Sequence, residues 1–251
     1  MDLGLDGLVF VLTGASRGLG FATAEALVAD GARVVISARD AGSVSRAAQD
    51  LGPSAAGAVA DLTDPETPGA LVDLAIERFG RFDGALISVG GPAPGTAGGV
   101  SDEQWRAAFE TVFLGSVRAA RTFAGALTGG GAIGLVLSTS VRTPLTGLGL
   151  SNGLRPGLAM VAKDMADEFG PRGVRVVSLL PGRILTDRTR QLLAAGADPA
   201  AAQTRAEAAI PLRRSAEPAE FGRVAAFLLS PAASYVTGSV IAVDGGSSRA
   251  L

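Results

Sequence analysis

Three glycines near the N-terminus have the spacing of a phosphate-binding turn. Gly14, Gly18 and Gly20 lie between an apolar run at residues 8–12 and a helix-like pattern at residues 21–28. Glycines let the backbone turn tightly and approach a pyrophosphate, while the N-terminus of the next helix offers free N–H groups to that anion. An ordinary βα connection is the alternative, but the strand–turn–helix context favours a dinucleotide site. The predicted contacts of the turn are Gly14, Ser16, Arg17, Gly18, Leu19 and Gly20.

Two arginines indicate which dinucleotide this turn would bind. Arg17 lies within the turn, and Arg39 directly follows a second apolar run at residues 33–38. Sites for NAD place an acidic residue at the end of this second strand to bond the ribose hydroxyls. Here Ala38 and Arg39 occupy that position, and guanidinium groups bind phosphate bidentately. We therefore predict NADP(H) rather than NAD(H); the alternative is that both arginines are solvated surface residues.

Composition excludes several kinds of chemistry. The 251 residues include no cysteine and no histidine. Disulfides and thiolate metal sites are thereby excluded, and the usual acid–base group at neutral pH is missing, so no metal is expected. A net charge of −2 offers no basic surface to nucleic acid. No segment has the pattern of a signal peptide or a membrane span, so we expect a cytoplasmic protein without a membrane partner.

Apolar runs alternate with helix-like segments along the whole chain. The predicted strands are residues 8–12, 33–38, 57–60, 83–91 including the exit from the strand, 132–137, 174–180 and 240–243. The predicted helices are residues 21–28, 64–78, 101–127, 151–169, parts of 184–210, and 217–229. Such alternation predicts an α/β fold: one Rossmann-like domain over residues 1–251, with helices on both faces of a doubly wound parallel sheet.

Several motifs taken together resemble the short-chain dehydrogenase/reductase family, with the 3-oxoacyl-[acyl-carrier-protein] reductases as the nearest type. The turn reads Thr-Gly-x-x-x-Gly-x-Gly, Pro181-Gly182 follows the sixth strand, and the sequence closes with Tyr-Val-Thr-Gly at 235–238 and Val-Asp-Gly-Gly at 243–246. The resemblance spans residues 8–246 and implies a nicotinamide cofactor. It also implies further cofactor contacts at Asp61, Leu62, Gly90, Arg155, Pro181, Gly182, Ile184 and Thr186.

The catalytic residues that this resemblance implies are replaced here. Reductases of the family use a Ser, a Tyr that gives or takes the proton, and a Lys four residues later that holds the ribose and lowers the Tyr pKa. Counting thirteen residues from Ser138 places Ser151 at the Tyr position and Arg155 at the Lys position. The position of the helper Asn is Val112. Because the chain has one tyrosine, Tyr235, no other alignment restores the motif.

Three functions remain open after this loss. We expect an atypical oxidoreductase that moves hydride to or from a small carbonyl, imine or enone, with Ser138, Ser151 and Arg155 at the catalytic positions. General acid help is worth roughly 100- to 10,000-fold, so ordinary ketone reduction should be slow. A non-catalytic NADP(H)-binding sensor or regulatory protein is the main alternative. A non-redox isomerase, cyclase or dehydratase would need a carboxylate such as Asp187, although that residue fits a helix cap better.

Two further expectations concern partners. Arg142, Arg155 and Arg183 could line the pocket and hold an anionic small-molecule substrate, or they could be solvated or ion-paired. The helix at residues 101–127 carries apolar residues around much of its girth, so more than one of its faces must be buried. We therefore expect a homodimer or homotetramer of closed symmetry, with residues 245–251 near an interface.

Overall fold

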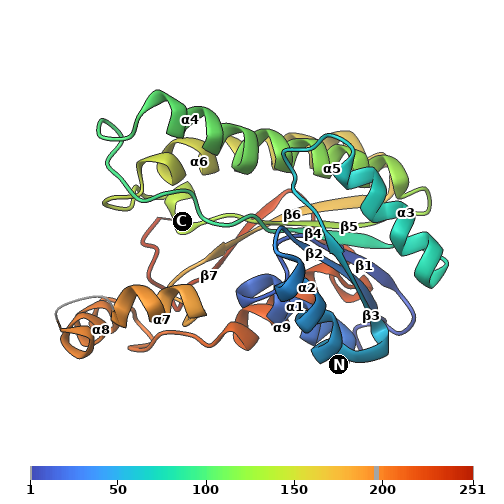
Figure 1. Ribbon diagram of the computed structural model, residues 1–251, viewed down its shortest axis with the longest axis horizontal. Coiled ribbons are helices and arrows are strands. Elements are labelled where there is room, and N and C mark those ends of the chain that lie inside the picture. Colours follow the sequence, from blue (N-terminus) through green and yellow to red (C-terminus); the bar gives the residue numbers. More distant parts are fainter. Residues whose placement is uncertain (1, 195–197, 251) are drawn as a thin grey trace.

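A computed structural model describes residues 2–194 and 198–250, and its centre is a seven-stranded parallel sheet (Figure 1). The strands are β1 (Val9–Leu12), β2 (Arg33–Ala38), β3 (Ala55–Val59), β4 (Gly84–Ile87), β5 (Gly131–Val136), β6 (Val174–Pro181) and β7 (Ser239–Val243). Their order is β3-β2-β1-β4-β5-β6-β7, so the winding reverses between β1 and β4. This confirms the predicted doubly wound fold, and ligands bind such sheets beyond the carboxyl ends of the strands at the point of reversal.

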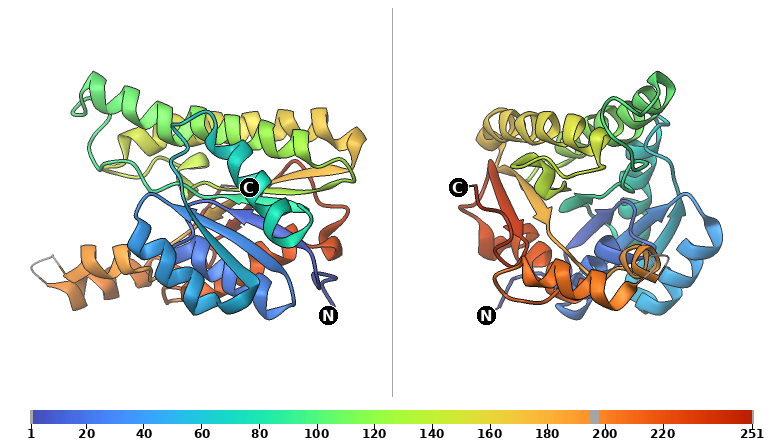
Figure 2. Two further views of the ribbon diagram at one scale, coloured as in Figure 1. Left: turned by 45° about the vertical axis from the view of Figure 1, so that its right-hand side comes forward. Right: turned by 90° about the vertical axis from the view of Figure 1, so that its left-hand side faces the viewer.

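Helices cover both faces of the sheet, as two further views show (Figure 2). The α-helices are α1 (Gly18–Ala29), α2 (Ala41–Leu51), α3 (Thr67–Phe79), α4 (Asp102–Ala108), α5 (Gly115–Ala126), α6 (Gly149–Phe169), α7 (Asp187–Ala194), α8 (Pro199–Ala208) and α9 (Pro218–Leu229). One face carries α3, α5 and α6, and the other carries α1, α2 and α9. Of the helices in the described ranges, none is long and apolar enough to cross a bilayer.

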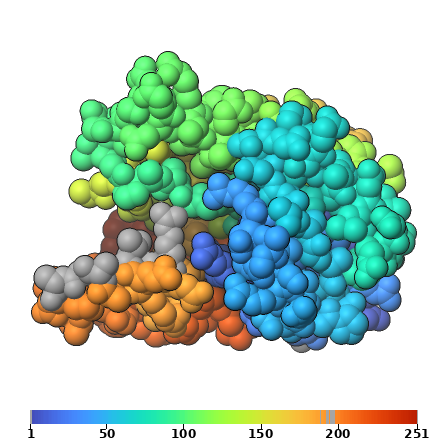
Figure 3. Space-filling view, viewed as in Figure 1, coloured from blue at the N-terminus to red at the C-terminus, as the bar shows by residue number. Residues whose placement is uncertain are grey.

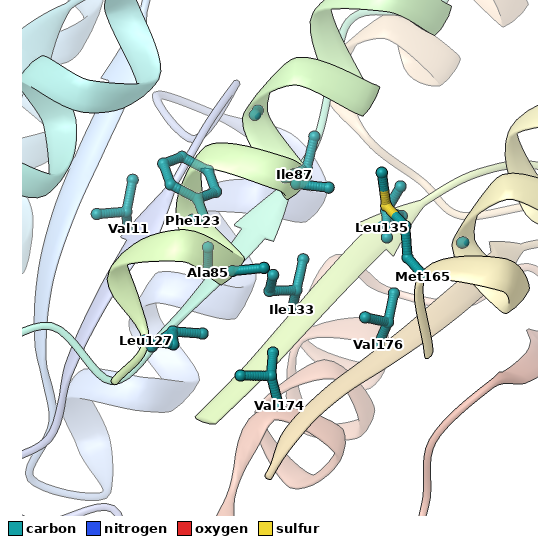
Figure 4. Close-up of a cluster of buried hydrophobic side chains, with 14 of the residues drawn as sticks. Val11, Ala85, Ile87, Phe123, Leu127, Ile133, Leu135, Met165, Val174 and Val176 are labelled. Carbon is teal, nitrogen blue, oxygen red and sulfur yellow. The ribbon is translucent and has the colours of Figure 1, made fainter. Parts of the chain in front are cut away.

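Two hydrophobic cores fill the space between sheet and helices. In the core of Figure 4, Val11, Ile87 and Ile133 from three strands meet Phe123 of α5 and Met165 of α6. The second core joins the opposite sheet face to α1, α2 and α9. Because both faces of a parallel sheet are buried, its strands read as continuous apolar runs rather than as alternating patterns. The burial of these runs fixes where each strand ends, and hence where the site lies.

The helix predicted over residues 101–127 is interrupted. It begins as expected at a capping box, in which Ser101 Oγ accepts the Gln104 N–H and Gln104 Oε1 accepts the Ser101 N–H. A π segment, Phe109–Leu114, then separates α4 from α5. At its end the Gly115 N–H donates to Glu110 O, five residues earlier. This segment therefore contains one residue more per turn than an α-helix, a feature often found at functional sites.

Other boundaries differ in ways that have local causes. The helix predicted to begin at Ser151 begins at Gly149, because the Asn152 N–H already donates to Leu148 O at 2.9 Å. The segment 184–210 forms α7 and α8, with residues 195–197 outside the described ranges. Asp187 is the first residue of α7 rather than its cap, since Thr186 Oγ1 accepts the Thr189 N–H at 3.3 Å.

Candidate functional site

Backbone geometry explains why the turn between β1 and α1 contains glycines. Gly14 and Gly18 have φ angles of +58° and +61°, a region that side chains disfavour. A Cβ at Gly14 would overlap the carbonyl oxygen of Ser88, and a Cβ at Gly20 would lie 2.8 Å from Gly14 O. The first turn of α1 has no side-chain cap from Arg17, its N-cap residue. The turn thus presents uncapped N–H groups at a helix N-terminus, which suits an anion.

Thr13 joins the ends of the two central strands beside this turn. Its Oγ1 donates to Ser88 O and accepts the Ser88 N–H, both at 3.0 Å. These two hydrogen bonds fix the separation between the carboxyl ends of β1 and β4, where the winding of the sheet reverses. A cleft of about 640 Å³ lies there, and Figure 3 shows the hollow between the blue and the green segments. Its lining comes from residues 13–17, 37–46, 60–62, 88–92 and 111.

Three arginines gather at one end of the cleft. Arg17 and Arg39 were predicted there, and Arg46 of α2 lines the same end. Asp40 caps α2 by accepting the Ser43 N–H at 2.8 Å. Hydrogen bonds from Ser43, and to a smaller extent the charges of Arg46 and Arg17, lower the pKa of Asp40. The sequence reasoning missed Arg46 because it assigned no helix to residues 41–51; the seven-residue spacing from Arg39 was the available signal.

The predicted adenine-side residues Asp61 and Leu62 also line the cleft, as does Gly90. Asp61 Oδ1 accepts both the N–H and the Oγ1–H of Thr63 at 3.0 Å. From α5, Arg118 donates one N–H group to Leu62 O and Thr63 O, each at 3.2 Å. A Cβ on Gly115 would lie 2.8 Å from Leu62 O, so α5 approaches this loop closely. The backbone of residues 61–63 is thus fixed by the hydrogen bonds between Asp61 and Thr63 and by those from Arg118 of α5.

At the expected catalytic positions, two buried hydroxyl groups meet. Ser140 Oγ and Ser151 Oγ lie 3.0 Å apart, and the residues are 3% and 6% exposed. Ser138, the third residue expected at the catalytic positions with Ser151 and Arg155, lies at the start of the turn that follows β5, where its Oγ accepts the Ser140 N–H at 3.1 Å. Val112, at the helper position, is buried among apolar side chains and supplies no amide.

Arg155 lies deep beneath these serines. It is 4% exposed, and one terminal N–H group donates to Val136 O at the end of β5. Its Nε is buried and has no hydrogen-bond partner within the described residues. Burial lowers the pKa of Arg155 to about 10, because the charged form loses its hydration. Arg155 is not among the residues that line the cleft, so its guanidinium is part of the interior beneath it.

The remaining predicted residues follow β6. Pro181 ends that strand, and a Cβ on Gly182 would lie 2.5 Å from Asp244 Cα, so the two segments touch. Ile184 is buried in the second core, whereas Thr186 lies against the glycine turn, where a Cβ on Gly18 would be 3.5 Å from its Cγ2. The structure therefore brings the segment after β6 against the glycine turn.

Arg142 and Arg183, which with Arg155 were the three arginines expected to hold an anionic substrate, differ in their surroundings. Arg142 donates to Val240 O and Ala250 O, both at 3.1 Å, so its guanidinium ties β7 and the C-terminal segment to the loop after β5. Because its guanidinium group already donates to these two carbonyl oxygens, Arg142 is not free to bind an anionic substrate. Arg183 has a buried Nε without a hydrogen-bond partner in the described part of the chain.

Comparison with known proteins gives consistent relatives over the full length. A family model described as enoyl-(acyl carrier protein) reductase matches residues 14–248. Galactitol 2-dehydrogenase (L-tagatose-forming) of Cereibacter sphaeroides is 35% identical over 250 residues, covering 96% of this chain and 95% of the relative. L-sorbose reductase of Gluconobacter frateurii, solved with NADPH and L-sorbose, has a TM-score of 0.93 at 31% identity, and all of both chains is covered.

A third similar protein bears on the replaced catalytic residues. The apo structure of a short-chain oxidoreductase from Pseudomonas aeruginosa PAO1, described as containing an atypical catalytic center, has a TM-score of 0.92 at 30% identity and covers both chains fully. The glycine turn, the parallel sheet with its cleft at the reversal point, and these matches agree. The chain belongs to the short-chain dehydrogenase/reductase family of oxidoreductases.

Proposed function

We propose that the protein is an NADP(H)-dependent oxidoreductase that acts on a small carbonyl, imine or enone. The observation that carries the choice of cofactor is the group Arg17, Arg39 and Arg46 at one end of the cleft. A 2′-phosphate carries two negative charges at a point where NAD(H) has a neutral hydroxyl. The cleft carries three guanidinium groups and two carboxylates, Asp40 and Asp61, and the excess of positive charge favours the phosphorylated cofactor. NADPH in the related L-sorbose reductase is consistent with this choice.

The residues of the cleft fit such a cofactor. The turn has no room for a side chain at Gly14 or Gly20, and the N-terminus of α1 is uncapped, as a pyrophosphate contact requires. Arg155 is proposed as a ribose contact because it stands at the position of the family's lysine. When bound, the cofactor supplies or accepts the hydride. The residues proposed to hold it are Gly14, Ser16, Arg17, Gly18, Leu19, Gly20, Arg39, Asp61, Leu62, Gly90, Arg155, Pro181, Gly182, Ile184 and Thr186.

Ser138, Ser151 and Arg155 are the residues proposed for the reaction. Ser138 would polarise the acceptor, and Ser151, hydrogen-bonded to Ser140, stands where the family has a phenol. A serine hydroxyl is a much weaker acid than a phenol, whose pKa is about 10. Substrates whose hydride step needs little protonation, such as iminium ions and polarised enones, therefore suit the site better than simple ketones.

Cofactor titration tests the proposal directly. Arg39→Ala and Arg46→Ala should each weaken NADPH binding by about 10- to 150-fold, since charge-assisted hydrogen bonds are worth about 1.5–3 kcal/mol. NADH binding should hardly change in either variant. Arg121→Ala, which removes an exposed arginine of α5, is the matched control. Equal wild-type affinity for the two cofactors would refute the NADP(H) preference, and no binding of either would refute the dinucleotide site.

A non-catalytic NADP(H)-binding sensor is the second candidate. The observation that favours it is the burial of both Ser140 and Ser151, which leaves little hydroxyl surface for a substrate. NADPH oxidation against a panel of ketones, imines and enones separates the two functions. Turnover above background excludes the sensor. Tight cofactor binding with no turnover on any class excludes the oxidoreductase.

A further inference from the structure

Asn152 is joined to the backbone of Leu145 by two hydrogen bonds. Its Oδ1 accepts the Leu145 N–H and its Nδ2 donates to Leu145 O, each at 2.9 Å. Asn152 is half-buried in the first turn of α6, next to Ser151. An amide side chain carries its acceptor and its donor on separate atoms, so Asn152 bonds both backbone groups of Leu145 at once. Asn152 therefore holds the loop at residues 142–148 in one place relative to α6.

This loop is in turn bonded to the loop at residues 92–99. The Gly95 N–H donates to Gly147 O at 2.7 Å, and the Gly149 N–H donates to Gly95 O at 2.8 Å. A Cβ on Gly149 would lie 2.5 Å from Ala97 N, so the two backbones approach as closely as glycine permits. The two loops thus form one surface, which we name the double-loop wall: residues 92–99 and 142–148.

The position of the double-loop wall links it to the cleft. Its first half continues directly from Gly90, Gly91 and Pro92, which line the cleft after β4. Its second half follows the turn with Ser138 and Ser140 after β5. Substrates reach such sheets from beyond the carboxyl ends of the strands, which is where this wall stands. A shift of one loop is expected to move the other, because Gly95 bonds both Gly147 and Gly149, and Asn152 ties Leu145 to the same first turn of α6.

We propose that Asn152 is a positioning residue that locks residues 92–99 and 142–148 into one wall of the substrate site. The inference rests on the proposed function for the identity of the reaction, but the lock itself is a property of the protein without ligands. Asn152 moves no proton and touches no reacting atom. It fixes where a substrate stands between the wall and the serines, so its loss should affect substrate binding more than cofactor binding.

Amide hydrogen exchange on the ligand-free protein tests the lock. Asn152→Ala should speed exchange of the Leu145 amide about tenfold, as expected for the loss of one hydrogen bond. The amides of Gly95 and Gly149 should speed up as well, although their own acceptors are unchanged. Asn152→Asp, which keeps an acceptor but sets an oxygen against Leu145 O, should do the same at Gly95 and Gly149. Asp164→Asn, an exposed site on α6, is the control and should change none of them.

If amide exchange became faster only at Leu145, or at none of these residues, the two loops would not form a single wall. The link to substrate is tested on the panel compound that the wild type turns over best. Asn152→Ala should raise its KM about tenfold while kcat and the NADPH Kd change less than about threefold. An unchanged KM beside faster exchange would overturn the positioning role. Failure of the wild type to bind NADPH or turn over any compound would instead refute the proposed function, and the exchange result would still decide the lock.

Discussion

Ser140 Oγ and Ser151 Oγ face each other at 3.0 Å inside the protein, with almost no exposure of either residue. Relatives of this chain are expected to place a phenol at the position of Ser151. Here the two hydroxyls satisfy each other and join the turn after β5 to the first turn of α6. The vacated position is therefore part of the protein's internal bonding.

A double-mutant cycle measures the coupling free energy between the hydroxyl groups of Ser140 and Ser151. Ser140→Ala and Ser151→Ala should each destabilise the protein by about 1–3 kcal/mol, because each leaves a buried hydroxyl without its partner. The double variant should cost less than the sum of the two, by about 0.5–1.5 kcal/mol. Urea unfolding of the four proteins checks the coupling. Additive effects would show that the two hydroxyls do not depend on each other.

Restoring the family residues should harm the native reaction. In the double variant Ser151→Tyr, Arg155→Lys, the phenol needs the space beside Ser140, which loses its hydroxyl partner. The lysine has no guanidinium group to donate to Val136 O as Arg155 does. We expect native turnover to fall at least tenfold, whereas slow reduction of simple ketones rises, since a phenol provides general acid help. Rates of NADPH oxidation on both substrate classes check this, with Arg155→Lys alone as the control. Unchanged native turnover would count against a role for Ser151.

Arg118 should affect only the adenosine half of the cofactor. Its two hydrogen bonds hold the backbone of Leu62 and Thr63 from α5. Arg118→Ala should weaken NADPH binding about three- to tenfold by freeing this loop. Binding of reduced nicotinamide mononucleotide, which lacks adenosine, should stay the same. Equal losses for both ligands in calorimetric titrations would indicate a general loss of structure instead.

Close packing of α1 against α9 depends on Gly222. A Cβ there would overlap the carbonyl of Ala22, which cannot move without disturbing α1. Gly222→Ala should therefore destabilise the protein by about 1–3 kcal/mol. Gly69→Ala in α3, where a Cβ meets nothing within 4 Å, should be neutral or stabilising by up to about 1 kcal/mol. Thermal melting of the two variants distinguishes these outcomes, and similar melting temperatures would contradict the tight contact.

Assembly can be tested on the outer face of the helices. Met160 of α6 is 70% exposed, and Phe109, the first residue of the π segment, is 43% exposed. We expect a homodimer or homotetramer that covers such side chains, and Met160→Glu should weaken it. Light scattering at micromolar concentration gives the mass of both proteins. A wild-type monomer would end this expectation.

Sequence patterns predicted the sheet well because buried parallel strands leave unmistakable apolar runs. They predicted the glycine turn because Gly14 and Gly18 are required by their φ angles, which no other residue type adopts easily. The sequence did not predict the contact between Ser140 and Ser151, since counting along the chain gives residue spacing but not which hydroxyl groups meet in the fold. Arg46 was missed along with its helix. Its role depends on where α2 starts, and that is set by the Asp40 cap.

The orientation of α4 relative to α5 at this edge of the cleft depends on the number of residues in the π segment between them. It lets Thr111 face the cleft while Gly115, only four residues on, sits against Leu62. Each residue of an α-helix turns the chain by about 100°, so removing one residue here would rotate everything on one side relative to the other. Substitutions can alter what Phe109–Leu114 present, but only an insertion or deletion can change which way α4 and α5 face. A change in the length of this segment would therefore displace Thr111 from the cleft or Gly115 from Leu62.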